Sequence, residues 1–161
     1  MLGTLQTSKV PNKTDGPDLE AAGSWAKKYY LASRALMESV LRPYDLGNTQ
    51  WYVLYLLAND GPMNQRDLTR MLDIERATLS AVISALVRKG LIDQMSDPDD
   101  QRQKVLQITT VGRNLWATLP DPIALIAAVA FDGVDGAEIE TTNRVLRDAT
   151  QRLNNYKKGR K

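Results

Sequence analysis

The sequence contains neither cysteine nor histidine. The absence of cysteine excludes disulfides, thiolate nucleophiles, thiol redox sensing and cysteine-ligated metals. The absence of histidine removes the usual general base near neutral pH and the commonest transition-metal ligand. An enzyme of this composition would have to rely on carboxylates, lysine, tyrosine or hydroxyl groups. We therefore expect a binding protein rather than an enzyme, with no catalytic residues, no metal site and no cofactor.

The sequence also has little excess charge and no long apolar run. Its 21 Lys and Arg residues stand against 19 Asp and Glu residues, and the net charge of +2 does not by itself indicate a nucleic-acid partner. The longest apolar run, residues 123–131, is well short of the roughly 18 to 20 residues that span a bilayer. The N-terminal residues lack the basic start and apolar core of a secretory signal. We expect a cytoplasmic protein with no membrane partner.

The 161 residues, 43% of them hydrophobic, are enough for one domain with appended helices. Residues 1–19 mix Gly, Pro, Ser, Thr and charge, and we expect a flexible arm there. An apolar stripe at three- to four-residue spacing then predicts a helix of about 20 residues that ends near Pro43. The members of the stripe are Trp25, Tyr29, Ala32, Leu36, Val40 and Tyr44. Thr49 is the expected N-cap of the next helix, with Leu46 packed against its start.

The following segment has the spacing of a helix-turn-helix. Asn64 is a suitable cap for a short helix that carries Asp67 in its first turn. After a short link, residues 75–90 predict a helix that ends at Gly90, because glycine favours the left-handed conformation just beyond a helix end. Its predicted inward residues are Leu79, Val82, Ile83 and Leu86. Two helices joined by so few residues are typical of a helix-turn-helix.

A predicted β-hairpin follows the second of these helices. Residues 91–97 and 104–109 have the composition of strands, and the turn between them is rich in Pro and Asp. Helix, turn, helix and hairpin in this order predict a winged helix-turn-helix over residues 46–110. The expected fold class is mainly α, with a small β-hairpin wing and flanking dimerisation helices.

The C-terminal residues 111–161 predict helices that one small domain cannot cover. Pro120 and Pro122 interrupt the first of them, and an apolar helix follows. The last helix has an apolar side and ends in a basic tail, for which extra phosphate contacts and a solvated helix end both remain open. Together with the helix of residues 20–45, these segments offer more apolar surface than a winged helix can bury, which indicates dimerisation.

The outward face of residues 75–90 has the composition of a DNA-reading helix. Such a helix buries one face and offers small or polar groups on the other, and Arg76 lies beside the backbone N–H groups at the helix start. The outward residues are Arg76, Ala77, Thr78, Ser80, Ala81, Ser84, Ala85 and Arg88. An ordinary amphipathic helix that packs on another helix through small residues explains the same pattern, and both interpretations stay open.

The turn of the hairpin holds a lone Arg among several Asp. Asp100 could hold the guanidinium of Arg102 in one orientation for insertion into a minor groove, and Lys104 could bind a phosphate. A solvated acidic turn is the alternative, because carboxylates outnumber cations there.

Residues 25–119 resemble the core of the multiple-antibiotic-resistance regulator (MarR) family. The resemblance rests on TQWYVL in the second helix, RDLTRML in the third, TLSAVISALVRKGLI in the reading helix and DPDDQRQKVLQITTVGR across the wing. It implies a homodimer whose terminal helices form a shared dimerisation layer. The two reading helices would then enter successive major grooves of a pseudo-palindromic DNA site of about 16 to 20 base pairs.

The resemblance also implies which residues meet DNA and a ligand. Arg102 would be the minor-groove residue and Asp100 its orienting partner. The candidate DNA contacts are Asn64, Arg66, Arg76, Thr78, Ser80, Ser84, Arg88, Asp100, Arg102 and Lys104. A small aromatic or phenolic effector would bind between the dimer layer and the DNA-binding lobe and release the DNA. Its candidate contacts, for which a core role is the alternative, are Tyr29, Tyr30, Met37, Trp51, Tyr52, Tyr55 and Trp116.

The function implied is that of a ligand-responsive repressor in a bacterial or archaeal cell, associated with the nucleoid. A winged helix that serves as a protein-interaction module, without sequence-specific DNA binding, is the alternative. An enzyme is a weaker alternative, because the only dense group of acids lies in the exposed wing turn.

Replacing Arg102 tests the wing. We expect Arg102→Ala to weaken operator binding at fixed salt by about 1–3 kcal/mol, because the side chain would contact DNA, and to leave thermal stability unchanged. Titration of a labelled operator and a thermal melt measure the two effects. Unchanged affinity would remove the wing from the mechanism.

Overall fold

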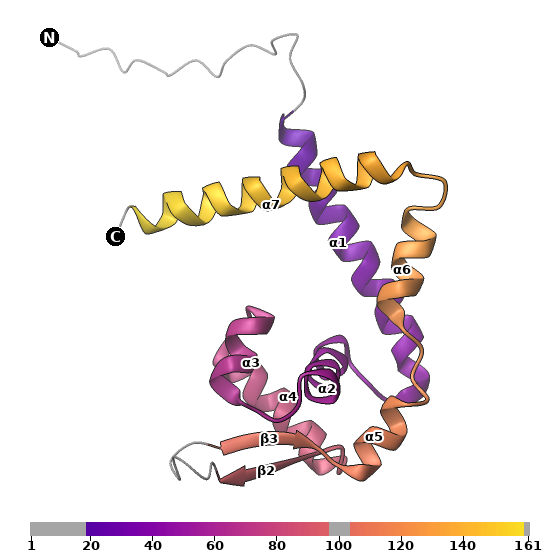
Figure 1. Cartoon of the computed structure of the whole chain (residues 1–161), viewed down its shortest axis with the longest axis vertical. Coiled ribbons are helices and arrows are strands. Elements are labelled where there is room, and N and C mark those ends of the chain that lie inside the picture. The colour runs from indigo at the N-terminus through magenta and orange to yellow at the C-terminus, as the bar shows by residue number, and fades with distance from the viewer. Residues whose placement is uncertain (1–18, 97–103, 160–161) are drawn as a thin grey trace, which may run out of the picture.

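The computed structural model describes residues 19–96 and 104–159, and it separates into a compact lobe and a set of helices that extend from it (Figure 1). The lobe contains α2, α3, α4, α5 and a three-stranded sheet, whereas α1, α6 and α7 extend beyond it. Along the described chain the elements are α1 (Leu19–Leu41), η1 (Arg42–Tyr44), α2 (Asn48–Asn59), β1 (Met63–Asn64), α3 (Gln65–Leu72), α4 (Arg76–Arg88), β2 (Ile92–Ser96), β3 (Lys104–Ile108), α5 (Thr110–Trp116), α6 (Pro122–Ala130) and α7 (Gly136–Lys158). The predicted order of helix, turn, helix and hairpin is confirmed.

The start of α2 differs from the prediction. Gly47, not Thr49, is the N-cap, and its backbone N–H donates to Gln50 Oε1 at 3.3 Å. Because the side chain of Gln50 reaches back to satisfy this N–H, the helix begins one residue before Thr49. Leu46 and Trp51, the residues on either side of the first turn, are both buried, as expected of a hydrophobic staple.

The helix-turn-helix forms as the sequence predicts. The Asn64 side chain caps α3 by accepting from the Asp67 N–H at 2.9 Å, and Asp73 ends that helix in the left-handed conformation with φ 49°. Of the predicted inward residues of α4, Leu79, Ile83 and Leu86 are fully buried and Val82 is half-buried. Gly90 has φ 67°, the left-handed conformation expected just beyond the helix end.

The small sheet has the strand order β1–β3–β2 and is antiparallel throughout. In the hairpin, Ile92 lies opposite Ile108 and Ser96 lies opposite Lys104. The short strand β1, which sequence reasoning did not predict, adds Met63 opposite Leu106. The turn between β2 and β3 falls outside the described residues.

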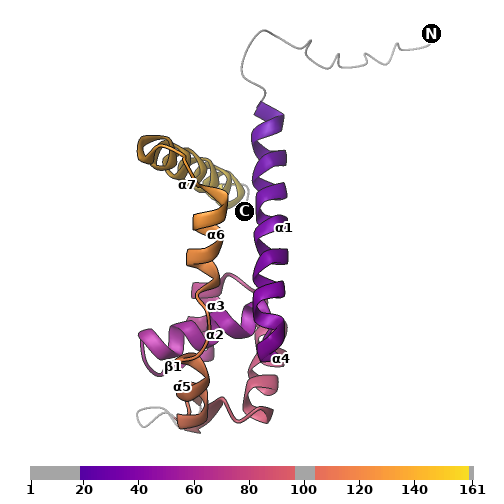
Figure 2. The same cartoon turned by 90° about the vertical axis from the view of Figure 1, so that its right-hand side faces the viewer.

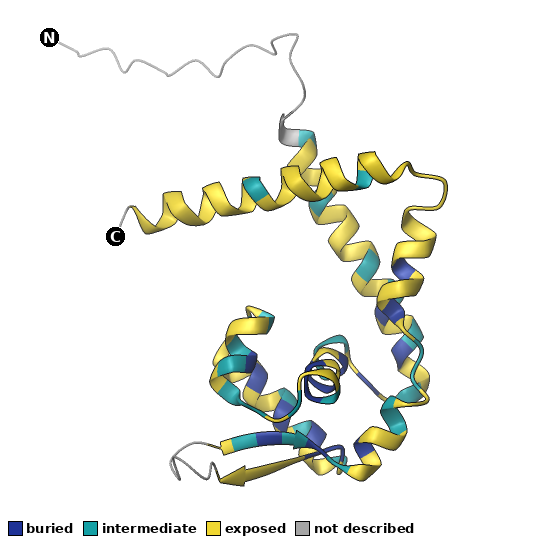
Figure 3. Cartoon of the chain, viewed as in Figure 1, coloured by how far each residue is buried: buried dark blue, intermediate teal, exposed yellow. Residues whose placement is uncertain are grey.

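The core lies mostly inside the lobe and extends beyond it to the C-terminal end of α1 and to Ile126 of α6 (Figure 3). Met37 and Leu41 of α1 are buried against it, whereas Trp25 is 65% exposed. Within one chain, no residue of the predicted apolar stripe is therefore fully buried. Its residues Trp25, Tyr29 and Ala32 are exposed because α1 extends past the lobe, and Leu36, Val40 and Tyr44 are half-buried.

The predicted break in the C-terminal helices is confirmed. Thr109 caps α5 by accepting from the Gly112 N–H at 3.0 Å, and Asp121 caps α6 by accepting from the N–H groups of Ile123 and Ala124, each at 3.0 Å. Figure 2 shows α6 beside α1, on which it packs. The 23-residue helix α7 has no buried residue. No helix in the described ranges carries an apolar stretch long enough to cross a bilayer.

Gly112 provides a test of the packing between α5 and the link from α4 to β2. A Cβ at this buried position would overlap the carbonyl oxygen of Leu91 and lie 2.8 Å from Ile108 Cγ1. We expect Gly112→Ala to lower the free energy of unfolding by about 1–3 kcal/mol, measured by chemical denaturation at fixed protein concentration.

The matched control is Gly23→Ala in the exposed part of α1, where an added Cβ meets nothing within 4 Å. It is expected to raise stability by up to about 1 kcal/mol through helix propensity alone. Equal effects of the two substitutions would contradict the close approach at Gly112.

Candidate nucleic-acid interface

A cation-rich hollow of about 690 Å³ lies where α3, the start of α4 and the start of β3 meet. Its walls carry three arginines and a lysine, and no carboxylate is among the described residues that line it. The lining residues are Asn64, Gln65, Arg66, Thr69, Arg70, Arg76 and Lys104. We call this feature the basic hollow. It brings together four of the residues that the sequence proposes as DNA contacts.

Gln65, Thr69 and Arg70 were missed by the sequence reasoning. Gln65 and Thr69 are four residues apart on α3, as are Arg66 and Arg70, so each pair lies on one side of the helix. This spacing was available in the sequence. What was not available is that this side of α3 and the first turn of α4 border the same hollow.

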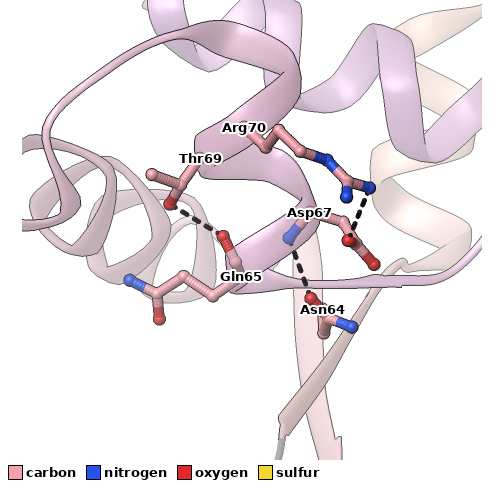
Figure 4. Close-up of polar contacts among 5 residues, drawn as sticks. All are labelled: Asn64, Gln65, Asp67, Thr69 and Arg70. Atoms are coloured by element: carbon pink, nitrogen blue, oxygen red, sulfur yellow. Dashed lines mark hydrogen bonds and ion pairs between the residues drawn. The ribbon is translucent and has the colours of Figure 1, made fainter. Parts of the chain in front are cut away.

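Hydrogen bonds around the start of α3 hold several of these side chains in place (Figure 4). Asn64 Oδ1 caps the helix, and Thr69 Oγ1 donates to the carbonyl oxygen of Gln65 at 2.8 Å. Arg70 is paired with Asp67 at 3.0 Å. The cap occupies the carbonyl oxygen of the Asn64 side chain, and its amide nitrogen is the group that remains for an external acceptor.

Arg66 and Arg76 have no ion-pair partner within the described residues. Arg76 is the first residue of α4, where the helix dipole disfavours a cation. Unpaired like charges in one hollow repel each other, and a bound anion such as a phosphate would relieve that repulsion. The hollow therefore has the electrostatics of an anion site beside the backbone N–H groups of a 13-residue helix.

The outward face of α4 presents small polar groups that are partly engaged with each other. Gln65 Nε2 donates to Ser80 Oγ at 2.6 Å, which joins α3 to α4. Ser84 Oγ donates to the Ser80 carbonyl oxygen at 2.9 Å, so its lone pairs remain for a donor. Thr78 is exposed. Ser80 Oγ accepts one hydrogen bond from Gln65 and keeps its own proton for an external acceptor.

The remaining predicted DNA contacts lie apart from the hollow or outside the described residues. Arg88 is at the opposite end of α4, about 18 Å from Arg76 along the helix axis at 1.5 Å per residue. Asp100 and Arg102 belong to the undescribed turn.

A second cavity of about 430 Å³ lies between α1, α2, α6 and the link from α3 to α4. Of the predicted ligand contacts, four line it: Tyr29, Tyr30, Met37 and Tyr52. Arg34, which donates to the Tyr30 hydroxyl at 3.0 Å, adds a cation, and Asn48 adds an amide. Asn48 Oδ1 is buried without a hydrogen-bond partner among the described residues, so it is available to a ligand donor. We call this feature the aromatic cavity.

Burial, with a smaller contribution from Tyr30, raises the pKa of the Tyr52 hydroxyl. The phenol therefore stays protonated at neutral pH and can donate a hydrogen bond into the cavity.

The other three predicted ligand contacts pack on one another and do not line this cavity. Trp51 stacks on Tyr55 with ring centroids 5.3 Å apart, and Trp116 lies 5.5 Å from Trp51 and 6.0 Å from Tyr55. Trp51 is 2% exposed. This aromatic cluster joins α2 to the end of α5. In the described parts of the chain, no three acidic, His or Cys side chains gather as a metal site would need.

The element order, the sheet topology and the basic hollow beside α4 define a winged helix-turn-helix protein with a DNA-binding type of fold. Comparison with known proteins shows which family the lobe resembles. Residues 46–104 match the sequence model of the MarR family. Over this segment the chain is similar to the MarR family of transcriptional regulators.

Relatives and solved structures show the same similarity. The HTH-type transcriptional repressor IacR of Pseudomonas putida is 24% identical over 110 residues, which are 68% of this chain and 66% of that protein. The structure of Bordetella bronchiseptica BpsR, whose DNA binding is regulated by 6-hydroxynicotinic acid, superposes with a TM-score of 0.73 at 23% identity and covers 87% of this chain and 98% of that one. A mutant MarR from E. coli complexed with operator DNA has a TM-score of 0.71 at 19% identity, with 80% and 93% covered. Matches to the curated relatives named in these comparisons span between 50% and 82% of their length.

Proposed function

We propose that the protein is a homodimeric repressor that binds a pseudo-palindromic operator and leaves it when a small aromatic ligand enters the aromatic cavity. The basic hollow carries the DNA-binding part of this proposal, because it gathers unpaired cations beside the outward face of α4. A BpsR-like ligand response and an IacR-like repressor role are consistent with it.

Unburied apolar surface supports the homodimer. Helix α7 has no buried residue, although Leu146 and Leu153 lie on it, and Val129 of α6 is 65% exposed. Helices in proteins owe most of their stability to the packing of an apolar face, and α7 has no such packing within the described part of its own chain. A second copy that covers α1, α6 and α7 would supply that packing, and its two-fold axis would place two α4 helices about 34 Å apart.

The contacts to DNA divide into two kinds. Cations of the basic hollow would bind phosphates, which provides affinity that falls with salt. Thr78, the Ser80–Gln65 pair and Ser84 would face base edges in the major groove. Since these side chains are few and small, sequence-dependent DNA shape would contribute to specificity.

Neutralising Arg76 tests the DNA-binding part. We expect Arg76→Gln to weaken binding to the fragment upstream of the protein's own gene. The slope of log affinity against log salt should fall by about 1, because one phosphate contact is lost. Fluorescence anisotropy from 50 to 300 mM salt measures both effects, and sedimentation gives the oligomeric state of the free protein.

Arg113→Gln is the control, because Arg113 is an exposed residue of α5, at the other end of the lobe from α3 (Figure 1). It should leave the salt slope unchanged. A wild-type protein that runs as a monomer, or that prefers no duplex at low salt, would favour a protein-interaction module instead.

Filling the aromatic cavity tests the ligand response. Ala127 of α6 lines the cavity and is exposed to it, whereas the exposed neighbour Ala128 does not line it. A ligand that couples to DNA binding is expected to weaken it about 5- to 150-fold. The probes are 6-hydroxynicotinic acid and a panel of phenols. Ala127→Phe should abolish the response to an active probe with little change in DNA affinity, and Ala128→Phe should retain it. An equal response in both variants would place the ligand elsewhere.

A further inference from the structure

Lys89, which caps the C-terminal end of α4, reaches across to the segment that joins α1 to α2. Its ammonium group donates to the backbone carbonyl oxygen of Asp45, pairs with Asp45 Oδ2 at 3.0 Å and donates to Gln50 Oε1 at 3.3 Å. An ammonium group has three protons, and here all three have acceptors. The partners are 44 and 39 residues away in the sequence, so the contact joins distant parts of the chain.

The receiving segment is itself held in a defined conformation. Asp45 has φ 54°, a left-handed conformation that Asp and Asn tolerate better than most residues, and its N–H donates to the Arg42 carbonyl oxygen at 3.1 Å. Gln50 Oε1 also accepts the N–H of Gly47, the residue that caps α2. Lys89 therefore contacts the point where α1 ends and α2 begins.

The same segment forms part of the wall of the aromatic cavity. Lys89 lies in a hollow of about 520 Å³ that shares Arg34, Asn48 and Thr49 with the aromatic cavity. Asn48 Nδ2 donates to the Arg34 carbonyl oxygen at 3.1 Å, which ties the start of α2 to α1. A ligand that displaces Asn48 would displace the start of α2, to which Lys89 is bound.

We infer that Lys89 is a positioning residue that sets the orientation of α4 relative to α1 and connects α4 to the wall of the aromatic cavity. This role rests on the proposed function. A small change at this contact has a large effect at the other end of the helix, because a tilt of about 5° at Lys89 would move the start of α4, about 20 Å away, by about 1.7 Å. Contacts between DNA and the basic hollow are sensitive to such a shift, whereas a single exposed ion pair contributes little to stability.

Packing on α2, α3 and β2 also holds α4, and Lys89 adds a polar contact to the link between α1 and α2. Thr109 Oγ1 donates to the Gly90 carbonyl oxygen at 2.7 Å, so the same end of α4 is also bound to the base of the wing. The Thr109 contact connects α4 to the sheet, whereas the Lys89 contact connects it to α1 and α2.

The test uses Lys89→Met, which keeps the apolar stem and removes the ammonium group, and Asp45→Asn, which retains the left-handed preference and removes only the carboxylate charge. Each variant should weaken binding to the upstream fragment about 3- to 10-fold, with the salt slope unchanged and little change in melting temperature. The double variant should lose little more than Lys89→Met alone, because both changes break one contact.

A direct role of Lys89 on phosphate gives the opposite pattern and overturns the inference. Lys89→Met would then lower the salt slope by about 1, as for Arg76→Gln. Asp45→Asn would then strengthen DNA binding, because it removes a negative charge. DNA affinity equal to that of the wild type in both variants would also overturn the inference about Lys89. Binding of the wild-type protein to the upstream fragment tests the proposed function separately.

A measurement without DNA tests the same role. Because the chain has no cysteine, spin labels can be placed at Ser24→Cys on α1 and Ala81→Cys on α4 and diluted with unlabelled protein. The distance distribution between the labels should broaden or shift in Lys89→Met and in Asp45→Asn. Identical distributions in wild type and both variants would contradict the positioning role, whatever the DNA affinity.

Discussion

The burial of one face of α4 is the interaction on which the rest of the lobe depends. Leu79, Ile83 and Leu86 are all fully buried, and burying such side chains contributes about 1.5–3 kcal/mol each. With this face in the core, the opposite face of the helix must point to solvent. The small polar side chains there are presented by packing on the far side of the helix rather than by contacts of their own.

Charge is distributed against local preference at the start of α4. Arg76 occupies a position that the helix dipole disfavours, and the basic hollow collects it with Arg66, Arg70 and Lys104. Only Arg70 has an ion-pair partner there among the described residues, namely Asp67. A net charge of +2 for the whole chain hides this local concentration. Such an arrangement is understandable if an anion completes it.

The helices that extend from the lobe have polar and apolar groups without partners in the described chain. The aromatic cavity has a wall from α6 and a buried acceptor, Asn48 Oδ1, without a donor in the described residues. Helix α7 contributes nothing to the core of its own chain. The lobe holds most of the core, whereas α6 and α7 keep apolar side chains such as Val129 and Leu153 exposed.

Local chemistry made much of the fold predictable from the sequence. Asn64 caps α3, Gly90 ends α4 in the left-handed conformation, and the prolines separate α5 from α6, because each effect involves residues only a few positions apart. The apolar period of α4 likewise identified its buried face. The predicted N-cap of α2 was wrong because residues two positions apart, Gly47 and Thr49, could both serve, and the side chain of Gln50 decided for Gly47.

Contacts between distant residues could be decided only by the tertiary structure. The sequence could not show that α3 contributes Gln65, Thr69 and Arg70 to the basic hollow. It also could not show that the seven candidate ligand contacts divide between the aromatic cavity and a packed aromatic cluster. Nor could it show Lys89 bound to Asp45. Composition and periodicity determine which elements form and which face of each is apolar, whereas which side chains meet depends on how those faces pack across the core.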